Sequence, residues 1–101
     1  MLFLQISRHA PESCPLHNET VKKLTADLMD KMDQLTQKHG IKVIGGWNSM
    51  PEHLIVVVYD APSMEAVLKF SMEPEVIAWL GYHTTETREV MAFEESMKLM
   101  K

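Results

Sequence analysis

Three side chains that can bind a metal ion or move a proton lie close together near the start of the chain: His9, Cys14 and His17. Imidazole and thiolate groups are good ligands for zinc, copper and iron. The spacing is not one of the established zinc-ligand patterns, and Glu12 or His83 would have to supply a fourth ligand. The segment predicts either a metal or haem site formed by His9, Cys14 and His17, or a small-molecule pocket that uses His9 and Cys14 without a metal. The alternative is structural, a loop that caps the helix after it.

Cys14 is also a candidate nucleophile. It precedes a predicted helix, where backbone N–H groups and the helix dipole favour a thiolate. His9 or His17 could then act as its base. The alternative is a buried, unreactive cysteine.

A second set of residues could bind an aromatic molecule. It consists of Trp47, Asn48, Trp79, Tyr82 and His83. An aromatic wall with one histidine and one asparagine suits a planar aromatic substrate and a reactive oxygen species. Ordinary core and interface packing is the alternative use of the same side chains.

The elements that must position these residues follow from hydrophobic periodicity. Between residues 18 and 39, apolar residues recur at three- and four-residue steps, which predicts a long helix capped by Asn18 and ended at Gly40. Residues 53–59 form the clearest strand, because residues 54–58 are all bulky and apolar. The Gly45-Gly46 pair in another strand predicts a bulge or a close backbone approach. The full expectation is strands over 2–7, 41–48, 53–59 and 83–91, helices over 18–39, 63–73 and 75–80, and one or two helical turns over 93–101.

The order strand, helix, strand, strand, helix, strand is the split βαβ pattern. It predicts a single α+β domain over residues 1–101, with ferredoxin-like βαββαβ topology and a four-stranded antiparallel sheet. In that topology the first and third strands lie in the centre, and here they are the two most apolar strands. This agreement between topology and hydropathy supports the fold.

Both faces of the central strands are apolar, although the helices of such a domain cover only one. In the first strand Leu2, Leu4 and Ile6 alternate with Phe3, and residues 54–59 are apolar or aromatic throughout. A large exposed apolar sheet face is rare in a monomer, and two-fold dimers are the commonest oligomers. We therefore predict a homodimer joined through the sheet face opposite the helices.

Composition narrows the class of function. The chain is 46% hydrophobic and 24% charged, which is typical of a folded domain. Its net charge of −4 argues against a nucleic-acid partner, which would require a basic surface. A single cysteine excludes an intramolecular disulfide framework. No segment has the features of a membrane span or a signal peptide, so we expect a cytoplasmic protein without a membrane partner.

Element order and hydropathy resemble those of the dimeric α+β barrel proteins, in which two ferredoxin-like subunits pack sheet against sheet. Within that superfamily the chain is similar to small uncharacterised domains that share three features. These are a His-x-Pro-Glu-x-Cys-Pro loop (His9–Pro15), a tryptophan after the glycines of the second strand (Gly45-Gly46-Trp47), and an acidic helical tail after a polar fourth strand (Val90–Glu95). The resemblance implies a cavity between sheet and helices that Trp47 and Asn48 would reach.

The resemblance does not select one activity. The superfamily includes cofactor-free monooxygenases, haem-degrading enzymes, muconolactone isomerases and effector-binding regulators, and fold analogy cannot choose among them. We expect a homodimer that binds a small apolar or aromatic molecule. The alternative is a small oxidoreductase of the cofactor-free monooxygenase or haem- and metal-binding type, so whether the protein is an enzyme stays open. We expect that the protein needs no cofactor. The alternative is that it binds a metal ion or haem.

Overall fold

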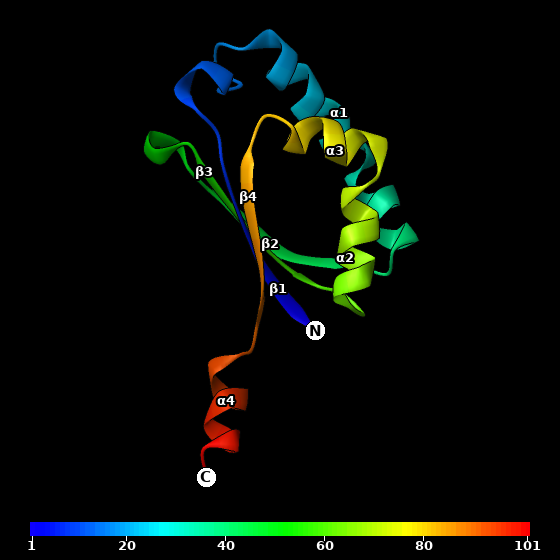
Figure 1. The fold of residues 1–101 in the computed structure, drawn as a ribbon, viewed down its shortest axis with the longest axis vertical. Coiled ribbons are helices and arrows are strands. Elements are labelled where there is room, and N and C mark those ends of the chain that lie inside the picture. The colour runs from blue at the N-terminus through cyan, green and yellow to red at the C-terminus, as the bar shows by residue number, and fades with distance from the viewer.

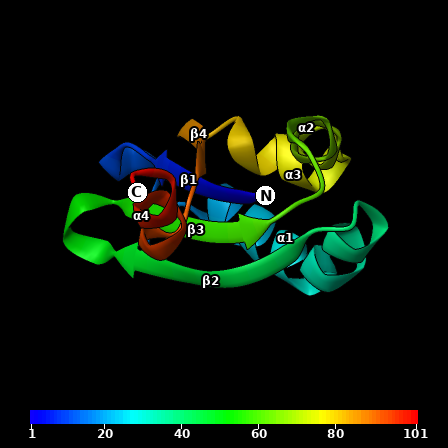
Figure 2. The same cartoon turned by 90° about the horizontal axis from the view of Figure 1, so that it is seen from below.

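The order of the elements is the one that the sequence predicts. In this computed structural model, which describes residues 1–101, the four strands form one antiparallel sheet in the order β2-β3-β1-β4 (Figures 1 and 2). The strands are β1 (Leu2–Arg8), β2 (Lys42–Ser49), β3 (Leu54–Asp60) and β4 (Thr84–Val90). The helices are α1 (Glu19–Lys38), α2 (Met64–Ser71), α3 (Pro74–Leu80) and α4 (Phe93–Leu99), with short 3-10 turns η1 (Pro11–Ser13) and η2 (Met50–Glu52). The α+β class, the ferredoxin-like topology and the central position of β1 and β3 are thereby confirmed.

Helix α1 begins and ends at the residues that its sequence indicates. The Asn18 side-chain oxygen accepts a hydrogen bond from the Val21 N–H at 3.0 Å, which satisfies one of the free donors of the first turn. Gly40 follows the helix with φ of 68°, a left-handed conformation that glycine adopts without strain. The apolar stripe between these ends buries Leu28 and Leu35 against the rest of the core.

The strand register decides which side chains lie under the helices. Three directly paired positions of β1 and β3 face the helices: Phe3 with Tyr59, Gln5 with Val57, and Ser7 with Ile55. The alternate pairs, Leu4 with Val58 and Ile6 with Val56, face the other way. Helices α1, α2 and α3 all lie on one side of the sheet, so no helix covers this second face (Figure 1). It is called the outer face below.

A bulge at Ile44 changes the faces of β2. Val43 pairs with Tyr59, but the next paired residue is Gly45, which lies opposite Val58. The extra residue puts Gly45 and Trp47 on the outer face and turns Asn48 toward the helices. The indole of Trp47 lies so close over Gly45 that a Cβ atom there would be 2.8 Å from Cη2 of Trp47. A side chain at this position would have to displace the exposed indole.

Helix α3 packs on α1 through an apolar cluster, and two ion pairs border the contact. Lys31 Nζ lies 3.2 Å from the carboxylate of Glu75, and Lys38 Nζ lies 2.7 Å from that of Glu73. This packing buries Trp79, the one aromatic side chain of α3. None of the helices combines the length and apolar composition needed to cross a lipid bilayer.

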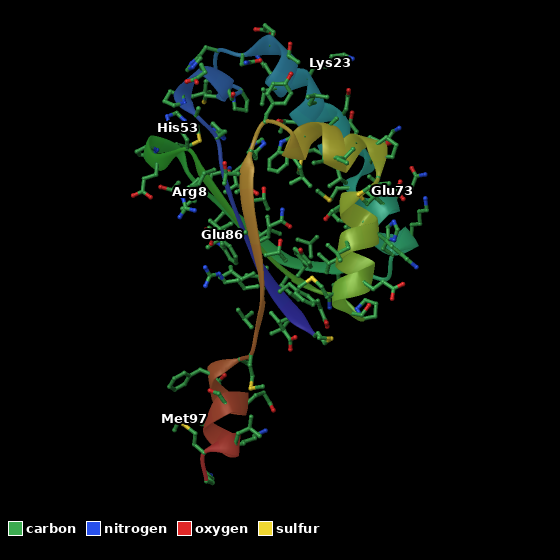
Figure 3. The ribbon with its side chains drawn as sticks, in the orientation of Figure 1. Arg8, Lys23, His53, Glu73, Glu86 and Met97 are labelled. Atoms are coloured by element: carbon green, nitrogen blue, oxygen red, sulfur yellow. The ribbon has the colours of Figure 1, made fainter.

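Helix α4 stands apart from the rest of the subunit. It projects beyond the end of the sheet, and the labelled Met97 lies far from the helices that cover the sheet (Figures 1 and 3). Its apolar side chains are exposed, with Phe93 at 73% and Leu99 at 74%.

Candidate functional site

A cavity of about 540 Å³ lies between the sheet and helices α1 and α3. The sheet contributes Gln5, Val57 and Tyr59, and the helices contribute Met32 and Trp79. Thirteen of the 19 residues around it are hydrophobic. Its size falls within the usual range of small-molecule pockets, roughly 300–1,000 Å³.

The cavity contains a few polar groups on an otherwise apolar wall. The Tyr59 hydroxyl donates a hydrogen bond to Oε1 of Gln5 at 3.0 Å. Burial raises the pKa of Tyr59 above its usual value, against an opposing effect of Thr87, so the phenol is protonated at neutral pH. On the helix side, the Trp79 Nε1–H donates to Thr25 Oγ1 at 3.1 Å, which fixes the indole at the edge of the cavity.

A second cavity, of about 190 Å³, adjoins the first at the end of the sheet. The two share part of their lining, the side chains Thr25, Asn48, Ile55 and Trp79. The rest of the smaller cavity includes His9, Cys14, His53 and His83. Polar and titratable groups therefore gather at one end of a largely apolar space.

Antiparallel pairing brings His9, which follows β1, and His53, which precedes β3, together at one end of the β1–β3 ladder. Arg8, the last residue of β1, pairs with Leu54, the first of β3, so the next position of β1 lies opposite His53. The His9 backbone N–H donates to the His53 carbonyl at 3.2 Å. His53 has φ of 53°, an uncommon left-handed conformation for a residue other than glycine. Its ring Nδ1 lies 3.3 Å from Nε2 of His9, at the end of the sheet marked by His53 in Figure 3.

Cys14 and His83 complete this cluster. Cys14 is buried, and its sulfur lies with the ring nitrogens of His9 and His53 in a group whose donor atoms are all within 4.8 Å of one another. The His83 ring stacks on Trp79 with centroids 3.6 Å apart and approaches His9 edge-on with centroids 5.3 Å apart.

The environment keeps two of these imidazoles neutral. Burial lowers the pKa of His9, and the nearby His83 and His53 lower it further, because a second positive charge would be repelled. Burial also lowers the pKa of His83, against the opposing effect of a hydrogen bond to the Trp79 carbonyl. Nδ1 of His9 and Nε2 of His83 are buried and have no hydrogen-bond partner. Neutral imidazoles retain a lone pair for a proton or a metal ion.

The structure brings together only some of the residues that the sequence singles out. His9, Cys14, Asn48, Trp79 and His83 line the smaller cavity. Trp47 borders the larger one, but its exposed ring lies over Gly45 on the outer face.

Three other sequence candidates lie outside the cluster. The exposed ring of His17 is 2.6 Å from the Pro11 carbonyl oxygen. Glu12 is exposed, and its backbone carbonyl accepts a hydrogen bond from the Asn18 side chain. Tyr82 is 40% exposed and lines neither cavity.

His53 is the residue that sequence reasoning missed. It stands 44 positions from His9, and only the antiparallel pairing of β1 with β3 places the two side by side. The available signal was that pairing: aligning the ends of the two most apolar strands sets the histidines opposite each other.

Comparisons with known proteins agree with this architecture. The sequence matches no established family profile and no curated protein. Among solved structures, an antibiotic biosynthesis monooxygenase is similar over 90% of this chain and 99% of its own, with 13% identity and a TM-score of 0.55. The protein Atu4242 of Agrobacterium tumefaciens matches over 92% and 96%, with 14% identity and a TM-score of 0.51. An uncharacterized NIPSNAP domain protein of Burkholderia xenovorans matches over 92% and 97%, with 13% identity and a TM-score of 0.50.

These similarities define the fold class. The chain shares its ferredoxin-like α+β fold with these three structures. At 13–14% identity they establish the fold alone.

Proposed function

We propose that the protein is a homodimer that binds a small apolar or aromatic molecule between its sheet and its helices. The observation that carries this proposal is the cavity of about 540 Å³, whose wall is mostly hydrophobic and includes only a few polar groups. Pockets of this kind bind small ligands by apolar contact and orient them by a few hydrogen bonds. The Tyr59–Gln5 pair and the Asn48 amide are the groups that would orient the ligand.

The outer face supports the dimer. Leu4, Ile6, Val56 and Val58 form an apolar strip across the two central strands. Glu86 on the edge strand β4 lies 3.8 Å from Arg8 and 3.1 Å from Arg88, which supplies a charged border beside the strip. An apolar centre with a polar rim is the usual composition of a protein interface.

Binding can be tested with N-phenyl-1-naphthylamine, an uncharged fluorophore that brightens in apolar surroundings. We expect saturable binding of one molecule per chain. Val57→Phe places a larger side chain on the cavity floor and should weaken binding more than tenfold, or about 1.4 kcal/mol. Met72→Phe adds an aromatic ring at a position that is 68% exposed and serves as the matched control. Equal affinity of the wild type and a folded Val57→Phe variant would overturn the proposal.

A small oxidoreductase of the cofactor-free monooxygenase type is the second proposal. The observation that favours it is that Asn48 and Trp79 line both the apolar cavity and the smaller cavity that contains the histidine cluster. A phenolic substrate in the cavity would lose its proton to a neutral imidazole and transfer electrons to O₂. One oxygen atom of O₂ would enter the ring as the second carbonyl of a quinone, and the other would leave as water with two hydrogens of the substrate. Oxygen uptake with an anthrone-type phenol would be the test. Uptake that persists in a His83→Phe variant would exclude this role for His83.

A further inference from the structure

We propose that His9, Cys14 and His53 form a binding site for a Zn²⁺ ion at the end of the sheet, beside the apolar cavity. This inference goes beyond the proposed binding of an apolar molecule and does not depend on it. It also replaces one residue of the ligand set expected from the sequence, because His53 occupies the place that His17 was expected to fill.

The two imidazoles are spaced as ligands of one ion. Nitrogens bound to a tetrahedral zinc ion at about 2.0–2.1 Å lie about 3.3 Å from each other. Nε2 of His9 and Nδ1 of His53 are 3.3 Å apart. A hydrogen bond between the two rings is the competing explanation of this contact, and the experiment below separates the two.

The third donor is Cys14. Its sulfur lies within 4.8 Å of the ligand atoms of both histidines, whereas a zinc-bound sulfur and nitrogen lie about 3.6 Å apart. A side-chain movement of about 1 Å would therefore complete the set. Three protein ligands with a fourth position open to water or substrate are characteristic of zinc sites that take part in chemistry, and the cavity of about 190 Å³ next to these residues has room for such a ligand.

The chemical types of the three ligand atoms determine which class of metal ion the site would bind. A thiolate and two imidazoles bind zinc and similar transition metals, whereas magnesium and calcium require oxygen ligands. No aspartate or glutamate lines the smaller cavity.

The backbone holds the three donors before any ion binds. The Cys14 N–H donates to the Pro11 carbonyl at 3.2 Å, and the Cys14 carbonyl accepts from the N–H groups of His17 and Asn18 at 3.1 and 2.9 Å. On the other side, the turn before β3 fixes His53 in its left-handed conformation. Little conformational entropy is then lost when a metal binds.

His83 is positioned to support a metal-bound His9. A histidine that binds metal through one nitrogen carries its proton on the other and usually donates it to a neighbour. For His9 that proton would lie on Nδ1, which is buried without a partner. Nδ1 of His83 donates to the Trp79 carbonyl at 2.8 Å, so its Nε2 is left as an acceptor, also buried and without a partner. The two free nitrogens belong to rings whose centroids are 5.3 Å apart.

The test is a metal titration of the purified full chain after treatment with a chelator. Co²⁺ is the optical probe, because a thiolate ligand gives a near-ultraviolet charge-transfer band and tetrahedral geometry gives intense visible bands. Zn²⁺ should then displace it. We expect one ion per chain and a loss of affinity of more than about 100-fold in Cys14→Ser and in His53→Asn.

His17→Asn is the matched control, since it removes a histidine from the same loop but outside the cluster. It should bind Co²⁺ with the same band and affinity as the wild type. Circular dichroism of each variant checks that it is folded, and Val57→Phe should bind metal normally even if it no longer binds the naphthylamine. The proposal is overturned if the wild type binds no stoichiometric ion, if folded Cys14→Ser keeps its affinity, or if His17→Asn loses as much as His53→Asn.

Discussion

The ring of His83 stacks on Trp79 with centroids 3.6 Å apart and donates its Nδ1–H to the carbonyl oxygen of the same residue at 2.8 Å. Trp79 is itself held by Thr25 through its Nε1–H. One chain of contacts therefore runs from the apolar cavity through the indole to the histidine cluster. It fixes His83 as the tautomer with a free Nε2, in a ring that approaches His9 edge-on.

This relationship makes stability depend on pH. The pKa values of His9 and His83 are both lowered from 6.5 in the folded protein, chiefly by burial. As pH falls below about 6.5, the unfolded chain binds protons first, so the free energy of unfolding decreases until pH passes the lowered values. Urea denaturation in the presence of a chelator, at pH values from about 7.5 to about 5, should show this decrease.

The matching variant is His83→Phe, which keeps an aromatic ring against Trp79 but cannot titrate. Its free energy of unfolding should depend less steeply on pH over the same interval. A pH dependence identical to that of the wild type would show that His83 does not contribute to it.

Val57 faces the helices, and we expect Val57→Asp to prevent folding. The side chain lies on the floor of the cavity and packs against the core cluster that contains Phe3 and Tyr59. Burying an unpaired carboxylate there costs several kcal/mol, which is comparable to the stability of a domain of this size. The measurement is far-ultraviolet circular dichroism. Recovery of this variant with the spectrum and melting temperature of the wild type would contradict the assigned register of β3.

Val56 is the neighbouring test of the outer face. We expect the wild type to have a mass in light scattering of twice 11.6 kDa, and Val56→Asp to be monomeric or insoluble. The reason is that a charge in the centre of an apolar interface cannot be solvated. A monomeric wild type at micromolar concentration would rule out the proposed dimer.

Alanine substitutions at the adjacent residues Gly45 and Gly46 should have different effects. A Cβ atom at Gly45 would meet the Trp47 ring at 2.8 Å, whereas at Gly46 the nearest atoms lie at 3.7 Å. Gly45→Ala should therefore displace the indole, shift the tryptophan emission and destabilise the fold by about 1 kcal/mol. Gly46→Ala should leave the emission unchanged. Equal spectra for the two variants would place Trp47 elsewhere.

The rate at which a reagent labels Cys14 provides an independent test of metal binding at the proposed site. The side chain is 4% exposed, so a bulky maleimide should label it slowly in the folded protein and rapidly in urea. Zn²⁺ should slow labelling of the folded protein by a further tenfold or more, as a metal-bound thiolate is protected from reagents. This protection should persist in His17→Asn and disappear in His53→Asn.

Local patterns account for what could be predicted from the sequence. The helix cap at Asn18, the left-handed Gly40 and the apolar run of β3 depend on neighbouring residues, and each lies where it was expected. The orientation of Gln5 and Ser7 toward the helices was harder to predict. Most residues of β1 are apolar, so the strand shows no clear alternation of polar and apolar residues.

The site was harder to predict because it depends on register. The bulge at Ile44 moves Trp47 and Asn48 to faces that an uninterrupted alternation would not give them. Likewise, the pairing of β1 with β3 brings His53 to His9, although nothing near His53 in the sequence indicates this neighbour.

Helix α4 has a consequence for how the chain folds. Its hydrogen bonds join only residues of its own segment, from Ala92 to Met100, and an isolated helix of seven residues is not stable in water. In the proposed dimer, contacts with the second subunit would stabilise this helix. Folding of the C-terminal segment should accordingly be coupled to association: on dilution, amide protons of 93–99 should exchange freely with solvent while those of the central strands remain protected.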